Sequence, residues 1–294
     1  MGDEKAAVTT ATRTVEVAGT RTRLVEAGPR GSGSGSDRAT EAVVFIHGNP
    51  GSAGDWVGPA GAVGEFARAV AFDLPDFGHS VASEGFGHTV PEYSAFTGEL
   101  IGSLGIEPVH LVLHDFGGPI GLLWAAANLD SVASVTLFNT GLMTGYRWHR
   151  AARIWQTPVL GELSMIVLNR SMFRKAIDDA EPQGLPAAFI DEMYDNYDRR
   201  TRRAVLDLYR SAKDIREESP AVAGVLRPAD IPCLVVWGAR DAYLPSKFAA
   251  AQRDAFPSAD VNLIEAGGHW PFIDHPDRSI ELLTGFLKGR VAAS

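Results

Sequence analysis

The fold of this chain is decided by the stretch Val109-His110-Leu111-Val112-Leu113-His114-Asp115-Phe116-Gly117-Gly118-Pro119. Its first half is a nearly continuous apolar run, which is typical of a strand buried on both faces of a sheet. A helix is predicted to begin at Pro119, because proline suits the first turn of a helix. Between the two, Gly117 and Gly118 allow a tight turn and a close approach of the helix. The pattern predicts that Asp115 lies at the centre of a strand-turn-helix elbow.

A carboxylate at Asp115 is expected to be ionised at neutral pH and stabilised by the dipole of the helix that follows. It needs no base to activate it and is suited to attack carbon. The alternative is that Asp115 only caps the helix, which is the more common role of an isolated aspartate in such a turn. Two further motifs favour the catalytic interpretation.

The other motifs also follow apolar runs. In Phe45–Gly51, a turn offers backbone N–H groups, and those of Asn49 and Phe116 are predicted to form an oxyanion hole. Later in the chain, Gly238–Asp241 and Gly267–His269 follow the last two apolar runs. The order nucleophile, acid, base along the chain is that of a hydrolase.

Apolar runs alternate with helical segments along much of the chain, which predicts a mostly parallel sheet with crossover helices. The runs predicted to be buried strands are 43–46, 69–72, 109–113, 134–138, 234–237 and 261–264. Alternating segments at 14–17 and 22–25 predict an opening hairpin. Residues 1–12 are expected to be a flexible tail, and the Gly-Ser repeat 31–36 a flexible loop.

The alternation breaks once, between residues 141 and 225. This segment has no strand-like run and shows the periodicity of amphipathic helices. It is predicted to be a helical cap inserted between two parts of one core, 13–140 and 226–294.

Composition restricts the partners. The 294 residues are 45% hydrophobic and carry a net charge of −9, so repulsion disfavours nucleic acid and anionic membrane surfaces. No apolar stretch approaches the roughly 18 residues of a membrane span, and the N-terminus does not resemble a secretory signal. We therefore expect a cytoplasmic, soluble protein. Cys233 is the single cysteine, so an internal disulfide is excluded, and its apolar surroundings predict burial.

Three ordered motifs, His47–Pro50, His114–Gly118 and Gly268-His269, resemble the α/β-hydrolase family. Within that family they are similar to the aspartate-nucleophile branch, which includes epoxide hydrolases and haloalkane dehalogenases. The resemblance covers about residues 14–290 and implies an eight-stranded, mostly parallel sheet with an inserted helical cap. The Gly-x-Ser-x-Gly motif of serine hydrolases is absent from the sequence.

The resemblance implies a mechanism in two steps. Asp115 attacks a substrate carbon to form an alkyl ester, and water activated by His269 then hydrolyses that ester. Asp241 is expected to orient His269, while the N–H groups of Asn49 and Phe116 stabilise the tetrahedral intermediate. No metal or organic cofactor is implied.

The leaving group distinguishes the two activities. An epoxide oxygen needs a proton, and epoxide hydrolases of this type supply it from phenols in the cap. Tyr209, followed by an arginine, resembles such a donor, although it could equally be a packing residue of an amphipathic helix. Its partner is expected in the segment where the chain enters the cap, and Tyr146 and His149 are both candidates.

Haloalkane dehalogenases usually hold the halide with an asparagine in the first loop and a tryptophan after the nucleophile. This chain has Asn49 but Phe116, which has no side-chain N–H, so Trp148 or Trp155 would have to replace it. These tryptophans are also expected to line an apolar pocket for a small organic substrate. The interpretations that remain are an epoxide hydrolase, a dehalogenase using the same aspartate, and a protein that binds a ligand without turnover.

Overall fold

The apolar runs of the sequence form the middle of an eight-stranded sheet in the computed structural model, which describes residues 9–29 and 40–291. The strand order is β1-β2-β4-β3-β5-β6-β7-β8. Strand β2 is antiparallel to both β1 and β4, and all the other neighbouring pairs are parallel. The strands are β1 (Thr9–Val17), β2 (Thr20–Gly28), β3 (Ala42–Ile46), β4 (Ala69–Phe72), β5 (Val109–His114), β6 (Val132–Phe138), β7 (Cys233–Gly238) and β8 (Asp260–Ile264). The α/β class predicted from the sequence is confirmed.

The opening hairpin is longer than predicted. Strand β1 begins at Thr9, inside the segment expected to be a flexible tail, because pairing with β2 continues as far as Thr9 opposite Gly28. This pairing satisfies the backbone N–H and C=O groups of the segment. Its polar side chains had given no indication of a strand. The Gly-Ser run 31–36 lies outside the described residues.

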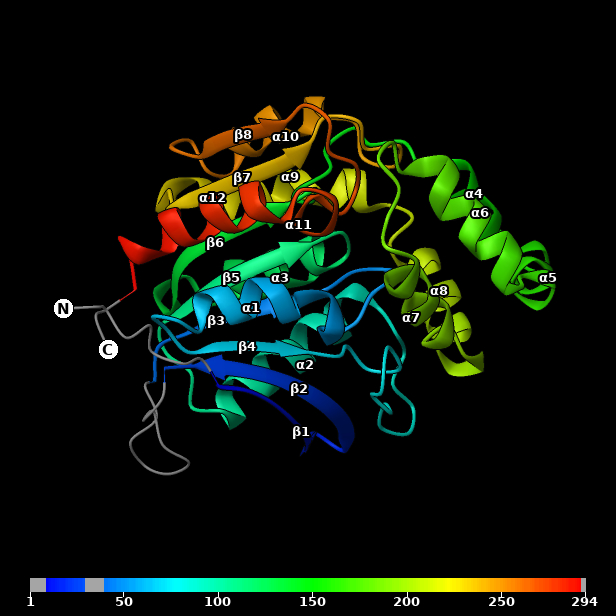
Figure 1. Ribbon diagram of the computed structural model, residues 1–294, viewed down its shortest axis with the longest axis horizontal. Coiled ribbons are helices and arrows are strands. Elements are labelled where there is room, and N and C mark those ends of the chain that lie inside the picture. The colour runs from blue at the N-terminus through cyan, green and yellow to red at the C-terminus, as the bar shows by residue number, and fades with distance from the viewer. Residues whose placement is uncertain (1–8, 30–39, 292–294) are drawn as a thin grey trace.

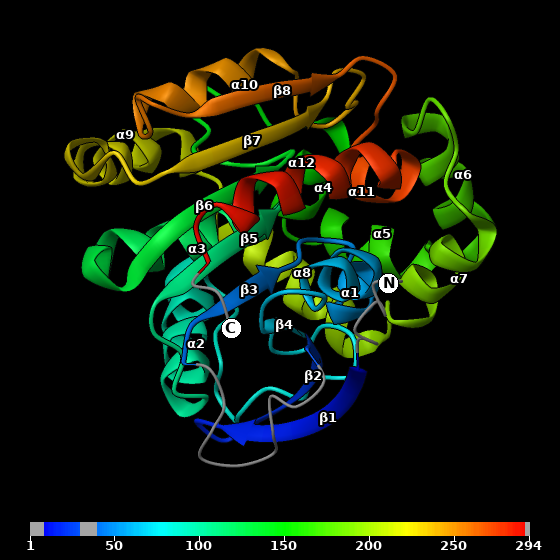
Figure 2. The ribbon, with the colours of Figure 1, turned by 60° about the vertical axis from the view of Figure 1, so that its left-hand side comes forward.

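Helices cover both faces of the sheet (Figures 1 and 2). One face carries α1 (Val57–Val63), α11 (Pro271–Asp274) and α12 (Pro276–Lys288). The other face carries α2 (Val90–Ser103), α3 (Gly117–Ala127), α9 (Ile215–Leu226) and α10 (Lys247–Ala251). Short 3-10 helices are η1 (Ala53–Trp56), η2 (Leu129–Ser131), η3 (Arg227–Ala229) and η4 (Gln252–Asp254).

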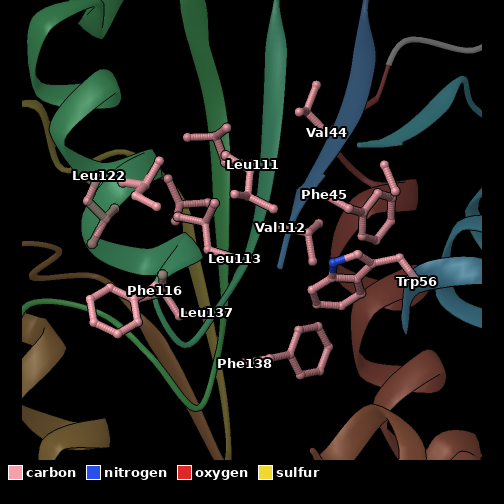
Figure 3. Close-up of a cluster of buried hydrophobic side chains, with 14 of the residues drawn as sticks. Val44, Phe45, Trp56, Leu111, Val112, Leu113, Phe116, Leu122, Leu137 and Phe138 are labelled. Carbon is pink, nitrogen blue, oxygen red and sulfur yellow. The ribbon is translucent and has the colours of Figure 1, made fainter. Parts of the chain in front are cut away.

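The core lies on both sides of β5, whose six residues are all buried. Figure 3 shows Leu122 of α3 on one side of this strand and Trp56 of η1 on the other. Trp56 also stacks on Phe272, with ring centroids 4.3 Å apart. Strands buried on both faces explain why the sequence shows continuous apolar runs here.

The cap consists of five helices that lie beyond the ends at which the parallel strands finish (Figure 1). They are α4 (Arg150–Gln156), α5 (Leu160–Val167), α6 (Arg170–Ala180), α7 (Ala187–Asp195) and α8 (Arg199–Ser211). Helix α9 also falls within the predicted cap segment 141–225, but it packs against α3 on the sheet. Among the described residues, the helices are too short or too polar to cross a bilayer.

Candidate active site

Asp115 occupies the elbow between β5 and α3 with a left-handed backbone, at φ 47°. Non-glycine residues seldom adopt this conformation, and it persists only where the surrounding structure enforces it. The Thr140 hydroxyl donates to the Asp115 carbonyl, and Gly118 N–H donates to the same oxygen at 3.0 Å. These contacts hold the turn that presents the carboxylate.

The turn after β3 meets this carboxylate directly. Asn49 N–H donates to Asp115 Oδ1 at 2.7 Å. A Cβ atom on Gly48 would lie 2.3 Å from the Asp115 Cβ, so only glycine allows this approach. Phe116, the other predicted oxyanion-hole residue, follows Asp115 and precedes α3, whose N-terminal N–H groups favour negative charge.

The structure brings the predicted histidine and acid to the same place. His269 Nε2 lies 3.6 Å from Asp115 Oδ2, which is longer than a hydrogen bond but within ion-pair range. On its other side, His269 Nδ1 lies 2.7 Å from Asp241 Oδ2. These three residues follow β5, β7 and β8, which are parallel strands of one sheet, so all three lie beyond the carboxyl ends of the strands.

Asp241 is buried and accepts from four donors. Its Oδ1 accepts from the backbone N–H groups of Tyr243 and Leu244, at 2.7 and 2.9 Å. Its Oδ2 accepts from Asn139 Nδ2 at 2.6 Å as well as from His269. Asn139 therefore supports Asp241 in this chain.

The charges of the site stabilise one another. Burial opposes ionisation of Asp115, but its contact with His269 holds the pKa of the carboxyl below its usual value. Burial also disfavours a charged His269, yet the carboxylates of Asp241 and Asp115 outweigh burial and raise the pKa of His269. The resting site therefore pairs an anionic nucleophile with a cationic histidine.

Two further histidines fix the backbone around the site. His47 Nε2 accepts from Leu74 N–H at 3.0 Å, so its Nδ1–H donates to the Gly48 carbonyl at 2.8 Å. His114 Nε2 donates to the His269 carbonyl at 2.9 Å, and burial lowers the pKa of His114 to about 3. Both are neutral in this environment, and their hydrogen bonds stabilise the turns that carry Asn49 and His269.

A cavity of about 130 Å³ lies between Asp115 and His269 on one side and the cap helices on the other. Aromatic and aliphatic side chains form most of its wall, which suits a small apolar molecule. Its lining residues are Asn49, Pro50, Asp115, Tyr146, Trp148, His149, Ala151, Trp155, Leu168, Phe173, Ala176, Ile177, Tyr197, Tyr209, Tyr243, Leu244, His269 and Trp270.

Tyr209, the proposed proton donor, comes from α8 and lines this cavity. Asn49 Nδ2 lies 3.5 Å from the Tyr209 hydroxyl oxygen, at the outer limit of a hydrogen bond. With the amide as donor, the phenolic proton of Tyr209 remains available to a substrate. Burial raises the pKa of Tyr209, so the phenol stays protonated.

The two candidates for a second donor line the cavity but are occupied elsewhere. The Tyr146 hydroxyl donates to the Tyr243 carbonyl at 3.1 Å, which takes up its proton. His149 caps α4 by accepting from Ala152 N–H at 3.3 Å, and burial lowers the pKa of His149 to about 4. A neutral imidazole is a weaker acid than a phenol, so neither residue matches the expected role.

Tyr197 is the cavity residue that sequence reasoning missed. It lies between α7 and α8, is buried, and interacts with the side chain of Asn49, as Tyr209 does. One signal in the sequence was available: Tyr197 comes immediately before Asp198, the N-terminal capping residue of α8, which is the helix that carries Tyr209. The sequence analysis places the second donor in the segment where the chain enters the cap.

Trp148 and Trp155, the two tryptophans proposed for the pocket, both line the cavity but differ in their contacts. Trp148 stacks on Phe116, with ring centroids 6.0 Å apart, and its indole N–H donates to the Lys213 carbonyl at 3.1 Å. That bond removes Trp148 as a halide donor. Trp155 packs edge-on against Tyr209 at 4.8 Å.

Within residues 9–29 and 40–291, no three His, Cys, Asp or Glu side chains are grouped as they would be around a metal ion. Cys233 is buried in β7, and burial raises the pKa of its thiol.

Comparisons with known proteins agree with this geometry. A model described as "Alpha/beta hydrolase family" matches residues 43–282. Haloalkane dehalogenase 2 of Mycobacterium tuberculosis is 26% identical over 246 residues, which cover 80% of this chain and 84% of the relative. The solved epoxide hydrolase CorEH has a TM-score of 0.79 at 19% identity, covering 96% of this chain and 99% of its own. The haloalkane dehalogenase DbeA from Bradyrhizobium elkani USDA94 has a TM-score of 0.79 at 21% identity, covering 96% and 98%.

Proposed function

Because the chain belongs to the α/β-hydrolase family, in the branch similar to haloalkane dehalogenases and epoxide hydrolases, we propose that it hydrolyses epoxides to diols. The observation that carries this proposal is the pair of cap phenols, Tyr197 and Tyr209, which share a cavity with the Asp115 carboxylate. Opening an epoxide requires a proton for the leaving oxygen, and phenols facing the nucleophile supply one.

In the first step, Asp115 attacks an epoxide carbon. Asn49 N–H holds Oδ1, which leaves Oδ2 to form the new C–O bond while the ring C–O bond breaks. The electron pair of the broken bond goes to the ring oxygen, which takes the proton of Tyr209 or Tyr197. An alkoxide is more basic than a tyrosinate, so the transfer is favourable even though burial raises the pKa of both phenols.

In the second step, water attacks the carbonyl carbon of the ester. Esterification removes the negative charge of Asp115, one of the two charges that raise the pKa of His269. His269 therefore loses its proton more readily and becomes a base, with Nδ1–H kept on Asp241. The proton that His269 gives up restores the tyrosinate left by the first step, and His269 then takes a proton from the attacking water. The oxyanion that forms is stabilised by Asn49 N–H and by the Phe116 N–H at the start of α3. Its collapse breaks the bond between the carbonyl carbon and the substrate oxygen, and the released alkoxide takes the second proton of the water, which leaves the diol, the Asp115 carboxylate and a protonated His269.

Dehalogenation is the second candidate, favoured by the Asn49 side chain at the cavity wall and by the 26% identical dehalogenase. A halide leaves as a weak base and needs only N–H donors. In this chain the Asn49 amide is shared with Tyr209, and the indole N–H of Trp148 is bonded to Lys213. Of the two tryptophans that could complete the halide cradle, only Trp155 is left, and it packs edge-on against Tyr209, which ranks this activity second.

Parallel turnover of styrene oxide and 1-bromobutane tests the proposal, with Asp115→Asn as the inactive control. Diol formation that disappears in the control is the expected result. Bromide release without diol would replace the proposal with dehalogenation. Activity on neither substrate, with measurable binding of both, would favour a ligand-binding protein.

A further inference from the structure

Glu181 is a buried carboxyl group that the two-step mechanism does not use. It follows the last residue of α6, so it belongs to the cap, and its side chain is only 4% exposed. Taking a carboxyl group out of water is unfavourable unless it is well paired. Burial raises the pKa of Glu181 to about 7, which reflects this cost.

The carboxyl group reaches the loop that carries the catalytic histidine. Glu181 Oε1 accepts from the backbone N–H of His269 at 3.0 Å. A Cβ atom on Gly268 would lie 1.8 Å from Glu181 Oε2, so the glycine before the histidine makes room for this contact. Among the described residues, no hydrogen-bond partner reaches Oε2.

The other hydrogen bonds to this loop come from the core. Asp274 of α11 accepts from Gly268 N–H at 2.6 Å, and Asn139 donates to the Gly268 carbonyl at 3.2 Å. His114 donates to the His269 carbonyl at 2.9 Å. These core contacts hold both backbone groups of Gly268 and the carbonyl of His269, whereas the cap residue Glu181 holds the N–H of His269 itself.

We propose that Glu181 is a positioning residue through which the cap fixes His269 for hydrolysis of the ester. This inference rests on the proposed covalent mechanism. It assigns Glu181 to the second step because Asp115 is held by Asn49 and by its own elbow, none of which involves Glu181. Loss of the contact should therefore leave alkylation of Asp115 intact and slow the step in which His269 acts.

The test compares Glu181→Leu, which removes the acceptor at similar size, with Glu181→Gln, which keeps an acceptor oxygen. Asp179→Leu is the matched control, because Asp179 is an exposed carboxylate of the same helix that pairs with Lys175. Rapid mixing with styrene oxide, followed by intact-protein mass spectrometry, separates ester formation from ester decay. We expect decay to slow at least about 10-fold in Glu181→Leu, with ester formation unchanged and wild-type rates in the other two variants.

Amide hydrogen exchange gives a second readout that needs no substrate. Peptides covering residues 265–272 should exchange faster in Glu181→Leu than in Glu181→Gln, with far-UV circular dichroism confirming that both are folded. Glu181→Ala, which removes the side chain beyond Cβ, replaces Glu181→Leu if that variant does not fold. Ester decay at the wild-type rate, or unchanged exchange, in the acceptor-free variant would overturn the inference.

His269→Gln separates this failure from failure of the mechanism. If His269→Gln accumulates ester but the acceptor-free Glu181 variants do not, Glu181 has no positioning role. If His269→Gln accumulates no ester, the covalent mechanism itself is wrong, and hydrogen exchange then decides alone whether Glu181 holds the loop.

Discussion

At the scale of single residues, the proposed mechanism depends on charges that change during the reaction. Asp115 and His269 stabilise each other in the resting state, which keeps the nucleophile ionised but also keeps the histidine protonated. Ester formation removes the negative charge and weakens the hold on the histidine proton. One pair of residues can thus serve as nucleophile first and as base second.

The cap phenols give a prediction that distinguishes the two leaving groups. Tyr209→Phe should slow alkylation by an epoxide on the order of 10²-fold, because one of the two phenols that can give a proton to the leaving oxygen is lost. Its reaction with 1-bromobutane, if any, should not slow in the same proportion, because a halide needs no proton. Rapid-quench measurement of the alkyl ester checks both.

Tyr194→Phe is the control for this measurement, because Tyr194 stacks with Arg170 and lies outside the cavity lining. The assignment is wrong if the double variant Tyr197→Phe/Tyr209→Phe alkylates with an epoxide as fast as Tyr194→Phe does.

The predicted site residues that the structure brings together are those that follow the ends of strands. Asp115, Asp241 and His269 each follow an apolar strand, and parallel strands deliver such residues to one edge of the sheet. Tyr197 was missed because cap helices have no comparable fixed frame. Its place in the cavity depends on how α7 and α8 pack over the sheet, which periodicity along one helix does not specify.

At the scale of elements, the stability of α8 depends on the capping of its first turn. Asp198 accepts from the backbone N–H groups of Arg200 and Thr201 at 2.8 and 3.0 Å and so caps the helix that carries Tyr209. Asp198→Ala should lower the free energy of unfolding by about 1 kcal/mol, because these two donors lose their acceptor. Urea denaturation measures this change.

Asp179→Ala is the comparison for the cap, because it removes an exposed ion pair within α6 and should change stability by less than about 0.5 kcal/mol. Equal losses in the two variants would contradict a capping role for Asp198.

Element boundaries were predictable where burial controls them and less so elsewhere. The apolar runs at 43–46 and 69–72 coincide with β3 and β4, because strands buried on both faces need apolar side chains throughout. Strand β1 begins earlier than its alternating pattern indicated, since edge pairing satisfies backbone groups whatever the side chains are. Helix α9 lies in the segment predicted as cap but packs on α3, a tertiary choice that amphipathicity alone does not determine.

At the scale of the whole molecule, Glu181 couples stability to pH where cap and core meet. Its pKa in the folded protein is about 7, against an ordinary value of 4.5. Between these values the folded state binds more protons than the unfolded state, so stability falls as pH rises from about 4.5 through 7. The contribution is fully present at low pH and lost above neutrality.

Glutamine does not ionise, so the free energy of unfolding of Glu181→Gln should fall less than that of the wild type when the pH is raised from 5 to 8. The difference should be on the order of 3 kcal/mol. Urea denaturation of both proteins at the two pH values checks it. Parallel pH dependence in the two proteins would show that Glu181 does not titrate in this range.

The family and fold class could be predicted from three short motifs and their order, because the elbow, the first turn and the histidine loop are each set by local sequence. Both predictions are confirmed by the family match over residues 43–282 and by the sheet itself. The choice of leaving group lies in the cap, where side chains distant in sequence meet around Asn49. That is the part of the molecule in which sequence alone left alternatives open.

The central claim is that Asp115 becomes covalently modified and that His269 is needed to release it. His269→Gln incubated with an epoxide that the wild type turns over should gain the mass of one substrate molecule, located on the peptide that contains Asp115. An unmodified Asp115 in that variant, with the wild type still producing diol, would contradict the covalent mechanism.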